Sequence, residues 1–178
     1  MKNIFTVILC LVLFNIQAQE DNYINNQNRH EFRLDALEAL AIPNIEVNYE
    51  YVISKYSGAG LAVSISLDND FNEYQKYAIE PYYRQYFLNK KDFGARGLFV
   101  EGVLRFAGGE QDEFLPDLTT IQEENWFDMG IGLVVGQKWV SDNGFVFEIS
   151  IGGGRYLLNN NNDEGFIRGG VLIGYRFF

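Results

Sequence analysis

Cysteine and histidine are almost absent from this chain of 178 residues, which contains one of each. Cys10 lies in the apolar run near the N-terminus, so the rest of the chain has no thiol for a disulfide or a thiolate metal site. Nucleophilic catalysis usually needs a histidine base beside a serine or carboxylate, and only His30 is available. This scarcity argues against thiol chemistry, zinc and histidine-dependent catalysis.

Basic residues are also scarce, because 14 Lys and Arg stand against 24 Asp and Glu, which gives a formal net charge of −10 at pH 7. Such a chain is a poor partner for nucleic acid, whose phosphates are bound by clustered Lys and Arg. Proline is rare, with 3 residues against 18 glycines, and aromatic residues make up 16% of the chain. This composition favours an all-β protein.

No apolar run in the chain is long enough for a transmembrane helix. The run Ile4–Ile16 has about 13 residues, whereas a helical span needs roughly 20. It follows a short positive start and precedes Gln17-Ala18-Gln19, as in a secretory signal peptide. We therefore predict a removed signal at residues 1–18, an N-terminal segment at 19–28 and one β-domain at 29–178.

The sequence does contain repeated alternation of apolar and polar residues, with the period of two of β-strands. Eight such segments run approximately through Arg29–Leu37, Asn44–Ile53, Gly58–Leu67, Gln75–Phe87, Arg96–Phe106, Trp126–Val140, Phe145–Tyr156 and Phe166–Phe177. The first is the weakest, because Leu34, Leu37 and Leu40 also fit a helical period. Pro81 falls inside the fourth and cannot donate to a ladder, so we predict a β-bulge there.

One face of these segments is apolar, with residues such as Val47, Leu61 and Leu133, and the other carries nearly all of the strand charges. Acids and bases are equal in number on the charged face, and we predict that they form an ion-pair network inside a lumen. These residues are Arg33, Asp35, Glu46, Glu50, Glu80, Arg84, Glu101, Arg105, Asp128, Lys138, Glu148, Arg155, Arg168 and Arg176. Small residues such as Gly132 and Ser64 leave room for these long side chains.

Two architectures produce this pattern, since a soluble lipocalin-like barrel hides the apolar face and a membrane barrel displays it. Balanced charge with glycine suits a narrow lumen better than a face turned to water. Connections such as 54–57 and 141–144 are short, whereas 107–125 and 157–165 at the other end are longer, as in outer-membrane barrels. We therefore predict an all-β fold, an eight-stranded antiparallel up-and-down transmembrane β-barrel of outer-membrane type with a closed lumen.

Aromatic residues gather near both ends of the predicted strands, with Trp139 and Tyr175 toward the periplasmic rim and Trp126 and Phe127 toward the outer rim. The chain ends in "GYRFF", which resembles the aromatic C-terminal strand that the outer-membrane assembly machinery reads. We interpret the last strand as both a lipid-facing surface and an insertion signal.

Four stretches carry a resemblance to a known family: "PYYRQYF" at Pro81–Phe87, "GLFVEG" at Gly97–Gly102, "GFVFEISIGGGR" at Gly144–Arg155, and "RGGVLIGYRFF" from Arg168. The chain resembles a domain-of-unknown-function family of small bacterial outer-membrane β-barrel proteins over nearly its whole mature length. The resemblance implies the eight-stranded barrel but no activity, and no catalytic residue is carried across.

Candidate sites for chemistry are weak. His30 lies at the periplasmic start of the first strand, away from the outer rim where barrel enzymes act. Glu46 and Glu50 are four residues apart on a strand, hence about 13 Å apart, which fits neither glycosidase spacing. We predict no catalytic residue, no metal site and no cofactor. The connections at the outer end of the barrel are rich in Asp and Glu. We interpret them as solvated loops, and the alternative hypothesis is that they bind divalent cations.

Strand registers predict two specific ion pairs in the lumen. If the fourth and fifth strands pair so that Glu80 faces Arg105, the same antiparallel register places Arg84 opposite Glu101. In a later hairpin, a turn that ends with a left-handed Gly144 places Lys138 opposite Glu148 on one face.

The same turn places Trp139 opposite Phe147 on the lipid-facing side. We expect these pairs to exclude water and to leave a closed plug without a channel.

We therefore expect a small Gram-negative outer-membrane barrel with a charge-plugged lumen, a structural or surface-interaction role and no enzymatic activity. Its expected partners are outer-membrane lipid, lipopolysaccharide and, through the C-terminal strand, the outer-membrane assembly machinery. We expect a monomer that does not bind nucleic acid. Two alternatives stay open: a soluble periplasmic barrel that carries an apolar ligand, and a surface lipid-modifying enzyme.

Overall fold

The computed structural model describes residues 29–41, 43–67, 75–87, 94–114, 121–158 and 164–177. The predicted signal peptide at 1–18 and the segment 19–28 lie outside these residues. The elements in chain order are β1 (His30–Asp35), α2 (Ala36–Ala41), β2 (Asn44–Val52), β3 (Ser57–Ser66), β4 (Tyr77–Phe87), β5 (Gly97–Phe114), β6 (Ile121–Val140), β7 (Phe145–Tyr156), β8 (Gly165–Arg168) and β9 (Val171–Phe177).

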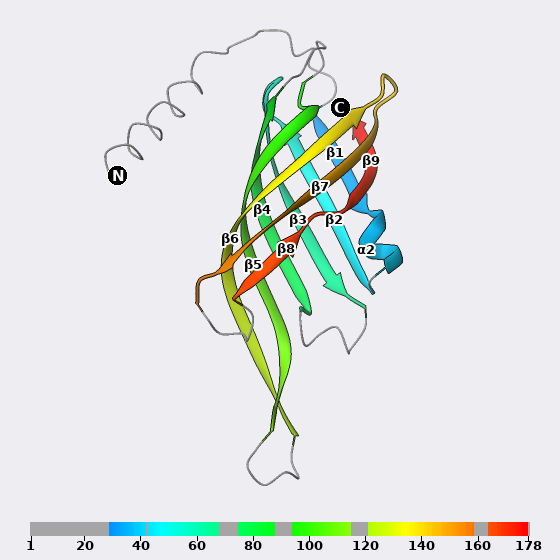
Figure 1. The fold of residues 1–178 in the computed structure, drawn as a ribbon. Coiled ribbons are helices and arrows are strands. Elements are labelled where there is room, and N and C mark those ends of the chain that lie inside the picture. Colours follow the sequence, from blue (N-terminus) through cyan, green and yellow to red (C-terminus); the bar gives the residue numbers. More distant parts are fainter. Residues whose placement is uncertain are drawn as a thin grey trace, which may run out of the picture.

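The strands form one antiparallel sheet that closes on itself (Figure 1). Each strand from β1 to β6 pairs with the next, β6 pairs with β7, β7 pairs with β8 and β9, and β9 returns to β1. β8 and β9 meet β7 in a single register, so they are two parts of one barrel strand that bends at Gly169, where φ is +141°. The predicted eight-stranded antiparallel up-and-down barrel is confirmed.

One seam of the barrel is built differently from the others. β1 pairs with β9 from His30, opposite Phe177, to Asp35, opposite Leu172, and then ends. The chain continues as α2, which contacts β2 and β9. β8 lies beyond this point and pairs with β7. Beyond Asp35, the seam between β1 and β9 therefore has no strand ladder, and α2 covers it instead.

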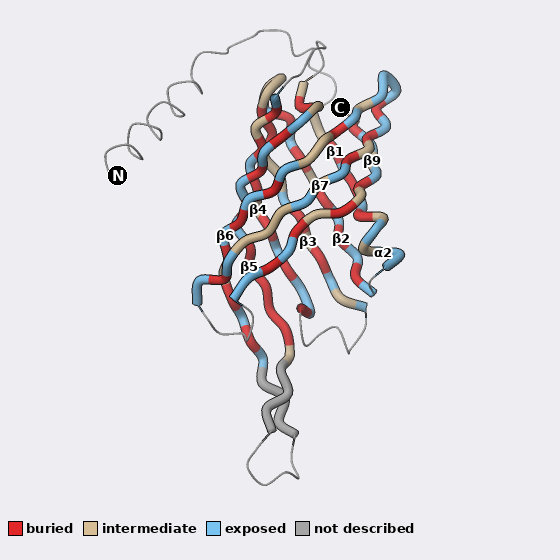
Figure 2. Tube along the Cα trace, viewed as in Figure 1, coloured by how far each residue is buried: buried red, intermediate tan, exposed pale blue. Residues whose placement is uncertain are grey.

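Buried and exposed positions alternate along the strands of the barrel (Figure 2), and the exposed side chains are apolar whereas most of the charged side chains are buried. Along β2 the side chains alternate between buried and more exposed positions, as the period of two requires. Outward residues such as Leu133 and Ile151 are 66% and 70% exposed, whereas Glu50 and Arg33, which point inward, are 0% and 1% exposed. This distribution is the reverse of a water-soluble domain and matches the predicted assignment of the two faces.

The first predicted strand is shorter than expected, because its last residues form α2. The carboxylate Oδ1 of Asp35 accepts hydrogen bonds from the backbone N–H of Leu37 at 2.8 Å and of Glu38 at 3.0 Å. These bonds satisfy donors of the first helical turn, as an N-cap residue does. The helical spacing of Leu37 and Leu40 was therefore the correct signal after Asp35. No helix in the described part of the chain is long and apolar enough to cross a membrane.

β5 and β6 are longer than the sequence predicts. Their pairing continues from Gly97, opposite Lys138, to Phe114, opposite Ile121. The predicted connection 107–125 thus shrinks to 115–120, which lies outside the described residues. The two strands project beyond the rest of the barrel as a hairpin (Figure 1).

The predicted β-bulge at Pro81 is wrong. β4 pairs with β5 at Tyr77–Ile79 and again at Tyr82–Phe87, in one register on both sides of the proline. On its other edge, Pro81 stays opposite Leu61 of β3. Glu80 and Pro81 are not paired with β5, and no extra residue is inserted, so the missing N–H of the proline interrupts the ladder without a bulge.

The β6–β7 hairpin has the predicted register and turn. Lys138 lies opposite Glu148, and Trp139 lies opposite Phe147, with ring centroids 5.5 Å apart. Gly144 has a φ of +92°, the left-handed conformation that a hairpin turn of this kind needs.

Candidate functional site

The lumen is filled by glutamates and basic side chains in equal number, each between 0% and 9% exposed. They are Glu31, Glu46, Glu50, Glu80, Glu101, Glu148, Arg33, Arg84, Arg105, Lys138, Arg168 and Arg176. Every second side chain of a strand points inward, and seven of the eight barrel strands, counting β8 and β9 as one, place a charged side chain there. All but β3 supply a charge.

Glu50 is a central acceptor of this network. Its Oε2 accepts hydrogen bonds from Arg33 at 2.9 Å and Arg84 at 3.1 Å, and its Oε1 accepts from Lys138 at 2.9 Å and the Tyr86 hydroxyl at 2.7 Å. Four donors from three other strands, β1, β4 and β6, thus converge on one carboxylate. Charge-assisted bonds of this kind are stronger than neutral ones, particularly where water is excluded.

Arg84 joins Glu50 to two further carboxylates. Its Nε donates to Glu101 at 2.5 Å, and its Nη1 donates to Glu148 at 2.8 Å. Arg33 also donates to Glu148. The carboxylate of β7 is therefore tied to strands β1 and β4 across the lumen.

A second layer lies toward α2 and is organised by Arg168. Its guanidinium donates to Glu101 at 2.9 Å and to Glu80, and it lies 3.4 Å from Glu46. Arg105 donates to the other oxygen of Glu80 at 2.7 Å. A pocket in this layer has a volume of about 10 Å³, room for about one water molecule.

The opposite end of the lumen is closed by Arg176. The Arg176 guanidinium pairs with Glu31 at 2.8 Å and donates to the backbone carbonyls of Gly94 at 2.6 Å and Ala95 at 2.8 Å. Ala95 is fully buried in an apolar cluster with neighbours that include Phe99. The residues that lead into β5, Gly94 and Ala95, thus lie at the mouth of the barrel.

Aromatic rings fill the space between the charged layers. The Arg84 guanidinium lies 4.3 Å from the centroid of Phe99 and 4.6 Å from that of Tyr82. Lys138 lies 4.7 Å from the centroid of Tyr86. These cation–π contacts add attraction in a desolvated site and remove space for water.

The structure brings together most of the residues that the sequence assigns to the lumen. Glu80 meets Arg105, and Arg84 meets Glu101, in the register that the sequence argument gives. Lys138 behaves differently from its prediction. Although it lies opposite Glu148, its ammonium reaches Glu31 and Glu50 at 2.9 Å each.

Arg155 is not in the lumen, and its assignment there is wrong. Its side chain is 71% exposed and lies 3.9 Å from Glu164. Glu148 points inward on β7, and Arg155 is seven positions further, so an uninterrupted alternation sends Arg155 outward. The pattern that identified the other inward residues would also have excluded this one.

Asp35 and Asp128 are buried, and their carboxylates accept hydrogen bonds from backbone N–H groups. Asp35 caps α2, and the Oδ1 of Asp128 accepts from the backbone N–H of Met129 at 2.7 Å and of Leu158 at 3.0 Å. Conversely, the sequence reading missed Glu31, which is fully buried. Its position two residues before Arg33 on the same face was the available signal.

His30 lies on the outside of the barrel wall. Its Nδ1 is 2.8 Å from the Tyr49 hydroxyl, and its ring packs against Tyr49 and Tyr51. Among the residues that the structure describes, no group of three or more His, Cys, Asp or Glu side chains could hold a metal ion. Five acidic residues of the predicted outer loops, Asp68, Asp70, Glu73, Asp117 and Asp163, lie outside the described ranges. Asp112, Glu113, Glu123 and Glu124 belong to the paired ladder of β5 and β6.

Comparison with known proteins addresses the fold. No sequence family profile and no curated protein matches the chain. Its structure is similar to the crystal structure of the N-terminal β-barrel domain of Pseudomonas aeruginosa OprF, with a TM-score of 0.52 and 15% sequence identity, over 85% of this chain and 98% of that one. The fold is that of an outer-membrane β-barrel. At this identity the likeness to OprF shows the fold alone, and membership in a particular family of small barrels stays a prediction.

Proposed function

We propose that the protein is a small outer-membrane barrel whose lumen is closed by its own ion pairs, with a structural or surface-interaction role and no enzymatic activity. The observation that carries this proposal is the network around Glu50, in which buried charges of both signs bridge the walls. A pore for solutes needs a continuous water path. Here the side chains that would line such a path bind one another.

The exposed apolar wall supports a place in the membrane. A soluble carrier would turn its apolar face to the lumen, whereas this lumen holds the charges. Fractionation of cells that express the full chain tests this part. We expect recovery in the outer-membrane fraction and solubility only with detergent; recovery in the soluble periplasm without detergent would contradict it.

Planar-bilayer recording tests the closed lumen. The wild-type protein is expected to show no stable ohmic conductance, because the paired side chains leave no aqueous path. A variant in which Glu50→Ala is combined with Arg84→Ala removes two connected charges of opposite sign and is expected to conduct. Stable conductance of the wild type at the level of this variant would remove the plug from the proposal.

The proposed partners are the lipid of the outer membrane, lipopolysaccharide and the assembly machinery that reads aromatic C-terminal strands. Phe177 stacks on Phe32 of β1, with ring centroids 5.6 Å apart, at the closing seam of the barrel. Replacing Phe177 by serine is expected to lower the amount of assembled barrel in cells. The protein is proposed to act as a monomer, which analytical ultracentrifugation in density-matched detergent would check.

The absence of enzymatic activity is supported by the surroundings of His30. Its ring packs against Tyr49 and Tyr51 on the outer wall, and its Nδ1 lies 2.8 Å from the Tyr49 hydroxyl. The test is a His30→Ala variant in assays of lipid hydrolysis and acyl transfer. Activity in the wild type that this substitution abolishes would overturn this part of the proposal.

A further inference from the structure

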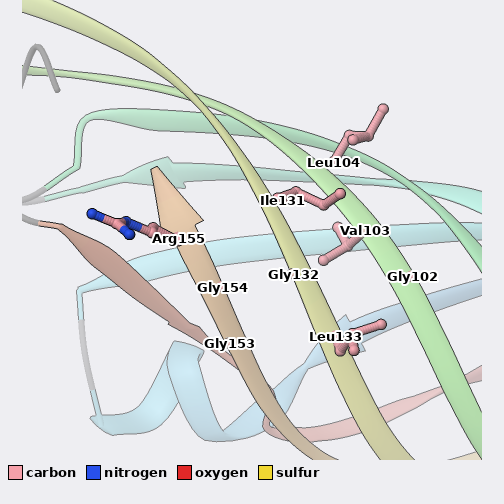
Figure 3. Close-up of a pocket in the computed structure, with 9 residues that line it drawn as sticks. All are labelled: Gly102, Val103, Leu104, Ile131, Gly132, Leu133, Gly153, Gly154 and Arg155. Carbon is pink, nitrogen blue, oxygen red and sulfur yellow. The ribbon is translucent and has the colours of Figure 1, made fainter. Parts of the chain in front are cut away.

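A groove crosses the outer surface of the barrel over β5, β6 and β7 (Figure 3). Its volume is about 620 Å³, within the range of roughly 300 to 1,000 Å³ that small-molecule sites occupy. It lies on the wall, not in the lumen. Under the proposed membrane location, this wall contacts lipid.

Strand register explains the shape of the groove. Gly102 of β5 lies opposite Leu133 of β6, which lies opposite Gly153 of β7, so one outward row has a side chain only at its centre. Leu133 consequently stands 66% exposed, with a hollow on each side. The next row consists of Leu104, Ile131 and Arg155.

Close packing requires a glycine at position 153 but not at position 102. A Cβ on Gly153 would lie 2.5 Å from the backbone oxygen of Phe166 in β8, so close packing of the strands accounts for that position. A Cβ on Gly102 would meet nothing within 4 Å, and its φ is not in the left-handed region. Packing and backbone conformation therefore leave the hollow at Gly102 unexplained, whereas a ligand that fills it would explain it.

Arg155 supplies a charge at one end of the groove. Its side chain is 71% exposed, and in Figure 3 its nitrogen atoms lie beside the end of β7, on the side away from Ile131 and Leu133. β7 runs from the turn at Gly144, at the same end of the barrel as the start of β1, to Tyr156 at the other end. If the start of β1 is periplasmic, Arg155 reaches the level of the outer-leaflet headgroups, as long basic side chains at membrane interfaces do.

We propose that this groove binds the lipid A part of lipopolysaccharide, with an acyl chain in the hollow at Gly102 and a phosphate on Arg155. The inference rests on the proposed place of the barrel in the outer membrane. An apolar channel that ends at an exposed guanidinium is complementary to an acyl chain that ends at an anionic group. Arginine binds phosphate through paired, charge-assisted hydrogen bonds. Glu164, 3.9 Å from Arg155, competes with the phosphate.

Native mass spectrometry of the full barrel, released from detergent micelles after titration with purified lipid A, tests the proposal. Gly102→Leu places a side chain in the hollow from a position where a Cβ meets nothing within 4 Å, and Arg155→Gln removes the charge. Each is expected to weaken retention of lipid A by about tenfold, a change of about 1.4 kcal/mol. Arg155→Lys should retain part of the affinity, and Glu164→Gln should strengthen binding.

Val47→Leu is the matched control, because it enlarges an outward side chain on β2, outside the groove. Retained resistance to unfolding by detergent on heating checks that each variant is folded. Equal retention of lipid A by all variants would overturn the proposal. So would equal binding of phosphatidylglycerol, which would assign the groove to ordinary phospholipid. A barrel that fractionates with the membrane and does not conduct, yet shows no preference for lipid A, would refute this inference and leave the proposed function in place.

Discussion

The ammonium of Lys138 on β6 donates a 2.9 Å hydrogen bond to the carboxylate of Glu50 on β2, although these strands form opposite walls of the barrel. The contact spans the lumen at full burial, since both side chains are 0% exposed. It shows that the charges do more than neutralise their neighbours along the sheet. They connect walls that no backbone hydrogen bond joins.

Removing the carboxylate of Glu50 is expected to be strongly destabilising. Glu50→Ala leaves Arg33, Arg84 and Lys138 without a shared anion in a buried site, and breaking a buried ion pair from one side costs about 3 to 5 kcal/mol. Urea unfolding in lipid vesicles, followed by tryptophan fluorescence, measures this loss. Glu164→Ala is the control, because its exposed pair should contribute less than about 1 kcal/mol. Equal losses for the two variants would contradict the role of Glu50.

The mouth closed by Arg176 should open when this side chain is shortened. Ala95→Cys introduces a thiol at a fully buried position, and the one other cysteine of the chain, Cys10, lies in the predicted signal peptide. We expect slow labelling of this thiol by a water-soluble maleimide, and labelling about tenfold faster when Arg176→Ala is added. Ser141→Cys, in an exposed turn, should react rapidly in both backgrounds. Unchanged protection of Ala95→Cys would show that Arg176 does not hold the segment.

The carboxyl of Glu38 in α2 should make stability depend on pH. Burial, followed by the nearby carboxylates of Glu46 and Asp35, raises the pKa of Glu38 to about 7. The folded state therefore prefers the protonated form more than the unfolded chain does. Its favourable effect is complete below about pH 4.5 and is lost as the pH rises to 7.

Glu38→Gln removes this titration and retains an acceptor for the Asn44 amide, which donates to Glu38 at 2.8 Å. We expect the variant to match the wild type at pH 5 and to exceed its free energy of unfolding at pH 8. The measurement is urea unfolding of both proteins at these two pH values. A constant difference between them across this interval would contradict the raised pKa.

Gly144→Ala should destabilise the β6–β7 hairpin. The φ of +92° disfavours any other residue, and a Cβ would lie 2.7 Å from the backbone oxygen of Arg176. A cost of about 1 to 3 kcal/mol is expected from backbone strain of this kind. Asn143→Ala, in the same turn but exposed, is the control in thermal unfolding. Identical midpoints for the two variants would show that the turn tolerates the change.

The sequence was sufficient to predict the barrel because its alternation is strict over most strands. Pairing Glu80 with Arg105 gives the register that places Arg84 opposite Glu101, and the turn residue Gly144 gives the register that places Lys138 opposite Glu148. Errors arose where the alternation was not followed to its end, as for Arg155. The end of β5 could not be located from the sequence, because the strand continues past Phe106 into the mostly polar residues 108–113, where apolar and polar residues no longer alternate.

The partners of each charge across the lumen could not be predicted. Pairing between neighbouring strands follows from register, but contacts between opposite walls depend on the barrel radius and on side-chain rotamers. Lys138 is the clearest case, because its length lets it pass its lateral partner Glu148 and reach Glu50. The groove on the outer wall could not be predicted either, because it depends on the registers that place Gly102 of β5 and Gly153 of β7 on either side of Leu133 in β6.

The seam at α2 has a mechanical consequence. β5 and β6 are joined by a ladder from Gly97 to Phe114, whereas the ladder of β1 with β9 stops at Asp35. In the proposed membrane location, lateral tension would be resisted by backbone hydrogen bonds where a ladder exists and by side-chain packing where α2 contacts β2 and β9. We therefore expect the wall to be more compliant at α2 than along the β5–β6 ladder.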